Sequence, residues 1–343
     1  MRIAQIVPSL VPQGPVRVAL DLGYLLRQRG HRVDFYYFDS LEGSEDPGGQ
    51  RERLSWHAPQ WGGHYDVIHS HGLRPDLYTG WYHKRLPSTV HTLHNYLRED
   101  LRYQYGPLKM KAAELLWNRA CKNHAASVVL SRDMEDYYHR FWRQQRFRII
   151  PNTRRIELSS QAALRQEKIR SWAAGRPVMI SLSTASQRKN LEALLPFLQQ
   201  EKDWCYVHVG GGALNRLQEK ARAMGLEARC LWLGPQARGW EFLPAADVFM
   251  LPSRSEGFPL SLLEAVKLKV PAVTSDLPVF RELFDGQEVA RFTLNDDKSL
   301  RESLSKVRQD GKARAERAFR RYQSQYSPEV VAGAYEKLYQ EIL

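Results

Sequence analysis

The sequence has few of the features that mark disulfide-stabilised, zinc-binding or membrane-spanning proteins. Only 3 of its 343 residues are cysteines, and they are widely spaced. An odd, scattered set argues against a disulfide framework and a zinc site, so we expect these cysteines to be buried. No apolar run reaches the roughly 18 residues of a membrane-spanning helix. Met1 leads directly into the strand pattern Arg2–Val7 instead of a secretory signal, so we expect a cytoplasmic protein.

A glycine-rich dinucleotide-binding loop is also missing. The pattern G-x-G-x-x-G does not follow the first expected strand, which argues against a dinucleotide oxidoreductase. A longer loop, Pro8–Pro15, stands in its place and contains a single glycine, Gly14.

Positive charge is in excess. Lysine and arginine total 50 against 38 acidic residues, a net charge of +12, which suits membrane surfaces, nucleic acids or phosphorylated glycolipids. From Asn95 to Arg155 there are 13 basic and 6 acidic residues. The aromatic residues between them are Tyr96, Tyr103, Tyr105, Trp117, Tyr137, Tyr138, Phe141, Trp142 and Phe147. A basic aromatic face is typical of contact with anionic lipid. A solvated basic face over core aromatics fits the same pattern.

Short apolar runs alternate with amphipathic helical segments along the chain. This alternation predicts parallel sheets covered by helices on both faces. The first series of expected strands comprises Arg2–Val7, His31–Phe38, Tyr65–His69, Thr89–Leu93, Ser127–Leu130 and Phe147–Ile150. The second comprises Val178–Leu182, Cys205–Val209, Arg229–Leu233, Val248–Leu251 and Ala272–Thr274. A polar segment, 152–176, separates the two series, so we expect two domains.

The segment Ser253–Ala265 carries the strongest functional signal. Glu256 falls in a turn between a buried strand and a helix, and Pro259 suits the first turn of that helix. The N–H groups of Gly257, Phe258 and Leu260 then lie at a helix N-terminus, which favours a phosphate. Carboxylates at Glu256 and Glu264 are acceptors suited to the hydroxyls of a sugar and a ribose. The pattern indicates a sugar-nucleotide site, although a helix-capping Glu256 and a solvated Glu264 fit it as well.

This segment, continued by Pro271–Pro278 and by Arg281-Glu282, resembles the donor-binding half of the GT-B glycosyltransferases, specifically the retaining family 4 (group 1) enzymes. The resemblance implies two Rossmann-like, doubly wound parallel-sheet domains facing a central cleft. Residues 1–155 would bind the acceptor and 156–326 the nucleotide-sugar donor. The last helix, 327–343, would pack back on the first domain.

The histidines His91 and His94 match the H-x-x-H segment of this family. By this match, His94 corresponds to the histidine of the family that faces the donor sugar. We expect His69, His71 and His91 to be hydrogen-bonded in the core, not to bind a metal.

Two loops depart from the pattern of the family. Lys189 falls on the lysine that grips the donor diphosphate, but the accompanying arginine is replaced by Thr184, with Arg188 as the neighbouring substitute. In the first domain the usual Gly-Gly pair is reduced to Gly14, because Pro15 occupies the second position.

The resemblance implies retaining transfer of a hexose or N-acetylhexosamine from a nucleotide sugar, with UDP favoured. The acceptor implied by the basic aromatic face is a lipid-linked glycan in polysaccharide, O-antigen or lipopolysaccharide assembly, reached by peripheral contact with the cytoplasmic face of the inner membrane. The expected catalytic residues are His94 and Glu256. The expected donor-binding residues are Lys189, Arg188, Gly257, Phe258, Pro259, Leu260 and Glu264. Gly14 is expected in an acceptor or phosphate loop, and neither a metal nor a cofactor is expected.

Two other functions remain open. The GT-B fold also includes nucleotide-sugar epimerases that hydrolyse their substrate. A basic nucleic-acid-binding protein would fit the net charge, although no RNA- or DNA-binding motif supports it.

Overall fold

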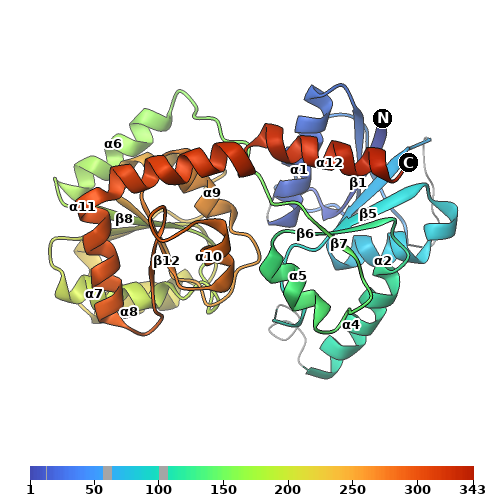
Figure 1. Ribbon diagram of the computed structural model, residues 1–343. Coiled ribbons are helices and arrows are strands. Elements are labelled where there is room, and N and C mark those ends of the chain that lie inside the picture. Colours follow the sequence, from blue (N-terminus) through green and yellow to red (C-terminus); the bar gives the residue numbers. More distant parts are fainter. Residues whose placement is uncertain (13, 57–63, 100–106) are drawn as a thin grey trace. The chain divides into compact units, whose positions relative to one another are not determined.

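The chain forms two compact α/β units. The computed structural model describes residues 1–12, 14–56, 64–99 and 107–343. Unit 1 comprises Met1–Arg155 and Gln325–Leu343, and unit 2 comprises Ile156–Ser324. Each unit is a parallel sheet with helices packed on it (Figure 1). The prediction of two parallel-sheet α/β domains is confirmed.

Unit 1 contains a seven-stranded sheet in the order β3-β2-β1-β4-β5-β6-β7. Its strands are β1 (Arg2–Ser9), β2 (Arg32–Asp39), β3 (Arg51–Arg53), β4 (Val67–His71), β5 (Ser88–Thr92), β6 (Ala126–Val129) and β7 (Phe147–Ile149). Its helices are α1 (Pro15–Gln28), α2 (Leu73–Trp81), α4 (Pro107–Cys121), α5 (Arg132–His139) and α12 (Pro328–Glu341). Every strand pairing is parallel, so the carboxyl ends of β1, β4 and β5 meet at one edge.

Alternation along β1 builds two cores in unit 1. Ile3 and Val7 belong to the core that α1 and α12 complete, whereas Ala4 and Ile6 pack on the other face with Tyr78 of α2. This division follows from the period of two in a strand, which sends successive side chains to opposite faces. Both faces of the sheet are therefore buried.

The helix α12 joins unit 1 although it follows unit 2 in the sequence (Figure 1). Tyr335 and Tyr339 are buried in the core that contains Ile3. The hydroxyl of Tyr339 lies 2.7 Å from His69 Nδ1, and that of Tyr335 lies 3.1 Å from Thr92 Oγ1. The last helix thus contributes both apolar and polar contacts to the first sheet.

Unit 2 contains a six-stranded sheet in the order β10-β9-β8-β11-β12-β13. Its strands are β8 (Val178–Leu182), β9 (Cys205–Val209), β10 (Cys230–Trp232), β11 (Val248–Leu251), β12 (Ala272–Ser275) and β13 (Ala290–Phe292). Its α-helices are α6 (Ala162–Ala173), α7 (Leu195–Gln200), α8 (Leu214–Ala223), α9 (Leu260–Lys267), α10 (Pro278–Leu283) and α11 (Asp297–Arg321).

The expected strands of both series are present, and those at 178–182, 205–209 and 248–251 have the predicted bounds. The three-residue strands β3 and β13 were not predicted. The three cysteines are free and buried, as expected. Among the residues that the structure describes, no helix combines the length and hydropathy required to cross a bilayer.

Candidate active site

Three loops of unit 2 meet at the carboxyl edge of its sheet. The loop after β8 is joined to the loop after β9 by Ser183 N to Val209 O (3.1 Å) and Ala185 N to Gly211 O (2.7 Å). Gly210 permits this approach, because a Cβ there would lie 1.9 Å from the carbonyl oxygen of Ser183. Its φ of 143° is also unfavourable for other residues. The edge where ligands bind in open α/β sheets is thus held in place by backbone contacts.

Glu256 forms the centre of an ion-pair cluster at this edge. Its Oε1 atom lies 2.5 Å from Lys189 Nζ and accepts a hydrogen bond of 2.5 Å from Ser253 Oγ. Its Oε2 atom accepts from Arg188 Nη1 at 3.3 Å. The side chain is only 4% exposed. The loops after β8 and β11 therefore bring two cations and one carboxylate together.

Burial and the two cations shift the pKa of Glu256 in opposite directions. Desolvation works to raise its pKa, but Lys189, Arg188 and the hydrogen bonds outweigh it and hold the pKa below the usual 4.5. The cluster therefore carries one negative and two positive charges at neutral pH, which favours an anion. A carboxylate has about four lone-pair sites, and the described residues occupy three of them, which leaves one acceptor position on Oε2.

The helix α9 begins one residue later than the sequence predicts. Pro259 is not in the first helical turn but is the N-cap, with φ −78° and ψ 110°, and the helix starts at Leu260. Gly257 and Phe258 are buried in the preceding turn. Glu264 lies within α9 and is 6% exposed, so neither Glu256 nor Glu264 is a solvated surface residue.

In unit 1, Gly14 precedes α1 at the carboxyl edge of the first sheet. It is exposed, with φ 47° and ψ −119°, and its carbonyl oxygen accepts from Val18 N at 3.3 Å. A Cβ added at Gly14 would meet no atom within 4 Å. Glycine is thus favoured here by the backbone conformation and not by close packing.

His94 follows β5 and is linked to a second histidine. Its Nε2 atom lies 3.0 Å from Nδ1 of His71, the last residue of β4. His71 Nε2 in turn lies 2.7 Å from Gln5 Oε1 on β1. Within the described chain, His94 Nδ1 is buried without a hydrogen-bond partner. Burial lowers the pKa of His94 to about 3, so the ring is neutral at physiological pH.

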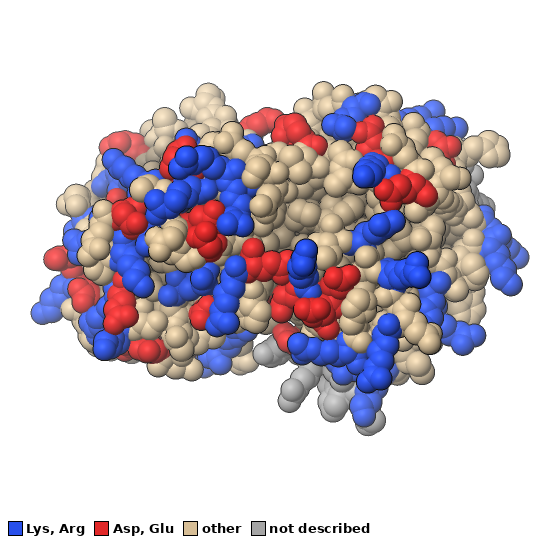
Figure 2. Space-filling model, viewed as in Figure 1, with Lys and Arg blue, Asp and Glu red and all other residues tan. Residues whose placement is uncertain are grey.

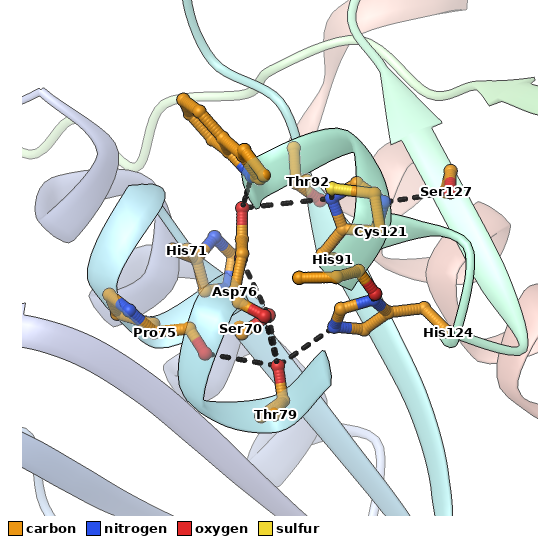
Figure 3. A network of polar contacts seen from close by, with 12 residues as sticks. Ser70, His71, Pro75, Asp76, Thr79, His91, Thr92, Cys121, His124 and Ser127 are labelled. Carbon is orange, nitrogen blue, oxygen red and sulfur yellow. Dashed lines mark hydrogen bonds and ion pairs between the residues drawn. The ribbon is translucent and has the colours of Figure 1, made fainter. Parts of the chain in front are cut away.

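Behind these residues a buried polar network occupies the space between α2, β4, β5 and α4 (Figure 3). Asp76 accepts from Ser70 Oγ at 2.6 Å and from Trp117 Nε1 at 3.0 Å. His91 Nε2 lies 2.7 Å from Ser127 Oγ, and its Nδ1 lies 3.6 Å from Asp76. Like His69 and His71, His91 is a hydrogen-bonded core residue, as the sequence predicts.

Family comparisons identify the chain. Residues 164–324 match the family model "Glycosyl transferases group 1", and residues 12–157 match "Glycosyltransferase Family 4". The chain belongs to the group 1 glycosyltransferases. Its two halves thus match two domain models of the same class of enzyme.

Several relatives and solved structures resemble this glycosyltransferase over most of its length. The O-antigen biosynthesis glycosyltransferase WclY of Escherichia coli is 26% identical, with 100% of this chain and 99% of WclY covered. An E. coli UDP-Gal:alpha-D-GlcNAc-diphosphoundecaprenol alpha-1,3-galactosyltransferase is 27% identical over 72% of this chain and 67% of its own. The structure of Anabaena HepE in complex with UDP-glucose superposes with a TM-score of 0.82 at 18% identity, covering 99% of this chain and 100% of HepE. The structural likeness confirms the GT-B fold.

Three buried polar residues of the glycosyltransferase, Gln5, His71 and His208, were not among the predicted site residues. Gln5 is a polar residue between apolar neighbours in β1, and His71 was assigned to the core alone. His208 on β9 is buried with both ring nitrogens unpaired among the described residues, and its Nε2 lies 3.4 Å from where a Gly210 Cβ would be. The sequence signal for His208 is its position two residues before the glycine run that follows β9.

The basic aromatic segment of the glycosyltransferase differs from an exposed aromatic face. Trp117, Tyr138 and Trp142 are buried, and Tyr137 and Phe141 pack against Tyr138. Tyr103 and Tyr105 lie outside the described residues. The interpretation of a basic face over core aromatics therefore holds for Trp117, Tyr138 and Trp142, whereas Tyr137 and Phe141 are half-buried.

Among the described residues of 95–155, the large exposed apolar side chains are Leu115 and Leu116 of α4 and Ile149 of β7, and Trp81 is exposed on the neighbouring α2. Trp81 is 77% exposed, Leu115 70% and Leu116 55%. The two helices are in contact, because Trp117 Nε1 of α4 donates to Asp76 Oδ2 of α2 at 3.0 Å. Exposed basic residues on and beside these helices are Lys84, Arg85, Lys111, Arg119 and Lys122. Figure 2 shows lysine and arginine side chains gathered over the part of unit 1 that holds α4.

Within the described ranges, no group of three or more His, Cys, Asp or Glu side chains is arranged to hold a metal ion.

Proposed function

We propose that this glycosyltransferase transfers a hexose or N-acetylhexosamine from a UDP-sugar to a lipid-linked glycan, with retention of configuration at the sugar. The observation that carries the proposal is the cluster of Lys189, Arg188 and Glu256 before the N-terminus of α9. Two cations, one carboxylate and a helix N-terminus give a net positive field suited to a diphosphate. An acceptor position on the same carboxylate suits a sugar hydroxyl.

Each residue then has a distinct role toward the donor. Lys189 and Arg188 would stabilise the diphosphate as the bond to the sugar breaks, and the N–H groups from Gly257 to Leu260 would contribute at the helix start. Arg188 would take the place of the arginine that Thr184 replaces. Glu256 would accept from hydroxyls of the donor sugar and Glu264 from the ribose, while His94 and the Gly14 loop would act from unit 1.

The reaction is written as a substitution on one face of the sugar. The bond between the anomeric carbon and the diphosphate oxygen breaks, and the acceptor oxygen forms a new bond to the same carbon. The acceptor proton passes to the departing diphosphate. We propose that neither a metal nor a cofactor takes part, because the side-chain cations and the helix terminus supply the positive charge.

Support for UDP and for a lipid-linked acceptor comes from the relatives. The E. coli galactosyltransferase uses UDP-Gal and a diphosphoundecaprenol-linked sugar by its name, and WclY acts in O-antigen biosynthesis. We therefore place the glycosyltransferase in O-antigen or lipopolysaccharide assembly. The exposed apolar residues Trp81, Leu115 and Leu116, with basic residues beside them, would bring it to an anionic membrane surface on the cytoplasmic side.

The first test is a thermal-shift panel of UDP-, GDP- and ADP-sugars with the wild type and with Lys189→Ala and Glu264→Ala. A donor at 100 times its Kd adds about 2.7 kcal/mol to the free energy of unfolding, so the UDP-sugar should raise the melting temperature. Both substitutions should reduce this shift. Lys220→Ala is the matched control, because Lys220 forms a lysine–glutamate pair of 2.8 Å on the surface of the same unit.

Product analysis tests the transfer itself. NMR of the glycan formed from a UDP-sugar and a diphosphoundecaprenol-linked acceptor should show the anomeric configuration of the donor. Inversion would refute the retaining mechanism. Release of UDP and free sugar at the same rate with and without acceptor would favour the epimerase or hydrolase class, and salt-dependent binding to nucleic acid without donor binding would refute the enzyme.

A further inference from the structure

Two strands of unit 1 and the segment after a third contribute one residue each to a hydrogen-bond chain that ends at His94. Gln5 lies on β1, His71 ends β4, and His94 follows β5. The distances are 2.7 Å from Gln5 Oε1 to His71 Nε2 and 3.0 Å from His71 Nδ1 to His94 Nε2. All three residues are buried.

The direction of these bonds follows from the orientation of the Gln5 side-chain amide, which places Oε1 toward His71 and leaves Nε2 buried without a hydrogen-bond partner among the described residues. An amide oxygen accepts and cannot donate, so His71 Nε2 carries the proton. Burial lowers the pKa of His71 well below 6.5, so its ring is neutral and Nδ1 is an acceptor. The proton between the two rings therefore belongs to His94 Nε2. Since His94 is neutral as well, its Nδ1 bears a lone pair and no proton.

His94 Nδ1 is the unpaired end of this hydrogen-bond chain. It is buried, and none of the described residues satisfies it. A buried polar atom without a partner is unfavourable unless a ligand completes it. A lone pair at this position accepts from a hydroxyl or an amide N–H, and it repels a carbonyl oxygen.

We propose that Gln5 and His71 are positioning residues that hold His94 as the Nε2–H tautomer, so that its Nδ1 accepts a hydrogen bond from a donor group of the substrate. The identity of that substrate, a hydroxyl-bearing sugar, rests on the proposed function. The tautomer of His94 does not rest on the proposed function, because residues of the protein alone determine it. Reversing the Gln5 amide would reverse every bond and turn His94 Nδ1 into a donor.

The direct test is the tautomer of His94 in the unliganded full-length protein. Protein labelled with 15N-histidine is examined at pH 7, and the His94 resonances are assigned by their loss in His94→Asn. An unprotonated Nδ1 and a protonated Nε2 are expected. The opposite tautomer, or a doubly protonated ring, would overturn the proposal without touching the assignment of a glycosyltransferase.

Substitutions at Gln5 test the relay. Gln5→Leu removes the acceptor for His71 and should give a mixture of His94 tautomers, whereas Gln5→Glu keeps an acceptor and should preserve the wild-type tautomer. The matched control is Gln145→Leu. Gln145 donates to Ser127 Oγ at 2.6 Å in the same unit, and it is not part of the hydrogen-bond chain from Gln5 to His94. A wild-type tautomer in a folded Gln5→Leu variant would overturn the relay.

Kinetics supply a second readout. Loss of one hydrogen bond of ordinary strength should lower the kcat/KM of Gln5→Leu by roughly 3- to 10-fold, with Gln5→Glu restoring most of it. A deoxy donor that lacks the contacting hydroxyl should be insensitive to Gln5→Leu. Equal losses for all deoxy donors would indicate that His94 Nδ1 meets no substrate group and would overturn that half of the proposal.

Discussion

Lys189 and Glu256 lie 67 positions apart in the chain and form an ion pair of 2.5 Å, in which Glu256 is buried and Lys189 uses one of its three N–H donors. Because Arg188 contacts the same carboxylate, the charge of the site depends on Glu256. Replacement of this one residue therefore separates two functions: attraction of the diphosphate and contact with the sugar.

Glu256→Gln should strongly slow sugar transfer without abolishing UDP binding. The substitution raises the local charge from one net positive to two, which favours the diphosphate, but it weakens the acceptor offered to the sugar. We expect kcat to fall by about 100-fold, as for loss of a group that acts on the transition state. Calorimetry with UDP should give a Kd equal to or lower than that of the wild type. Loss of UDP binding in a folded Glu256→Gln protein would contradict the assigned roles.

Asp76→Asn should reduce the pH dependence of stability. Burial raises the pKa of Asp76 to about 7, against the opposing effects of His124, Ser70 and Trp117. A raised pKa in the folded state adds stability below the unfolded value of 3.8, and this stability is lost as the pH rises through about 7. The asparagine variant can keep both contacts, because Ser70 Oγ also reaches Val90 O and can accept from the amide.

The measurement is thermal unfolding of the wild type and Asp76→Asn at pH 5 and pH 8. Between pH 5 and pH 8 the free energy of unfolding of the wild type should fall by about 3 kcal/mol relative to the variant, because about two pH units of the window from 3.8 to 7 lie in this range. Asp136→Asn, an exposed aspartate of the same unit, is the control. An unchanged difference between wild type and Asp76→Asn at the two pH values would show that Asp76 does not titrate there.

Gly210→Ala should destabilise unit 2 and weaken donor binding. The new Cβ would lie 1.9 Å from Ser183 O, so the loops after β8 and β9 must separate. Strain of about 1–3 kcal/mol is expected from the backbone conformation, with the collision in addition. Gly225→Ala is the control, because Gly225 also has a positive φ, 71°, but open space around it, so a Cβ there meets no other atom. Equal melting temperatures for the two variants would argue against the close approach.

Membrane association should depend on α2 and α4. Trp81→Ser and Leu115→Ser should each weaken binding to vesicles that contain anionic lipid, because they remove exposed apolar surface. Lys111→Gln and Lys122→Gln should each reduce it by about 1 kcal/mol, an effect that added salt should diminish. Leu164→Ser on α6 removes an equally exposed leucine from unit 2 and should have no effect. Salt-insensitive behaviour without vesicle binding would refute the membrane proposal.

Local patterns in the sequence predict most of the sheet but not the contacts between loops. The strand Val178–Leu182 could be located because a buried parallel strand is a short continuous apolar run. The strand Arg51–Arg53 could not, since its three polar residues become a strand only by pairing with β2 at the sheet edge. A motif assigned Lys189 and Glu256 to different parts of a ligand, but their direct pairing depends on how two distant loops fold.

The interior of unit 1 shows the same limit. A lone glutamine such as Gln5 produces no periodic pattern in the sequence. Its hydrogen-bonding role becomes evident only in the fold, where β4 and the segment after β5 bring His71 and His94 close to it. The aromatic residues of 95–155 were equally compatible with a surface or a core, because composition does not say which face of a helix is covered. Tertiary packing decided in favour of the core for Tyr138 and Trp142.

The position of α12 has a consequence for biosynthesis. Tyr335 and Tyr339 fill the core beside β1, yet the ribosome makes them only after all of unit 2. All residues of unit 2 are synthesised before α12. Unit 1, although most of it is made earlier, therefore keeps the apolar face that α12 covers exposed until α12 has been synthesised. A chain interrupted within α11 would keep that face uncovered, which makes such a fragment a ready target for chaperones and proteases.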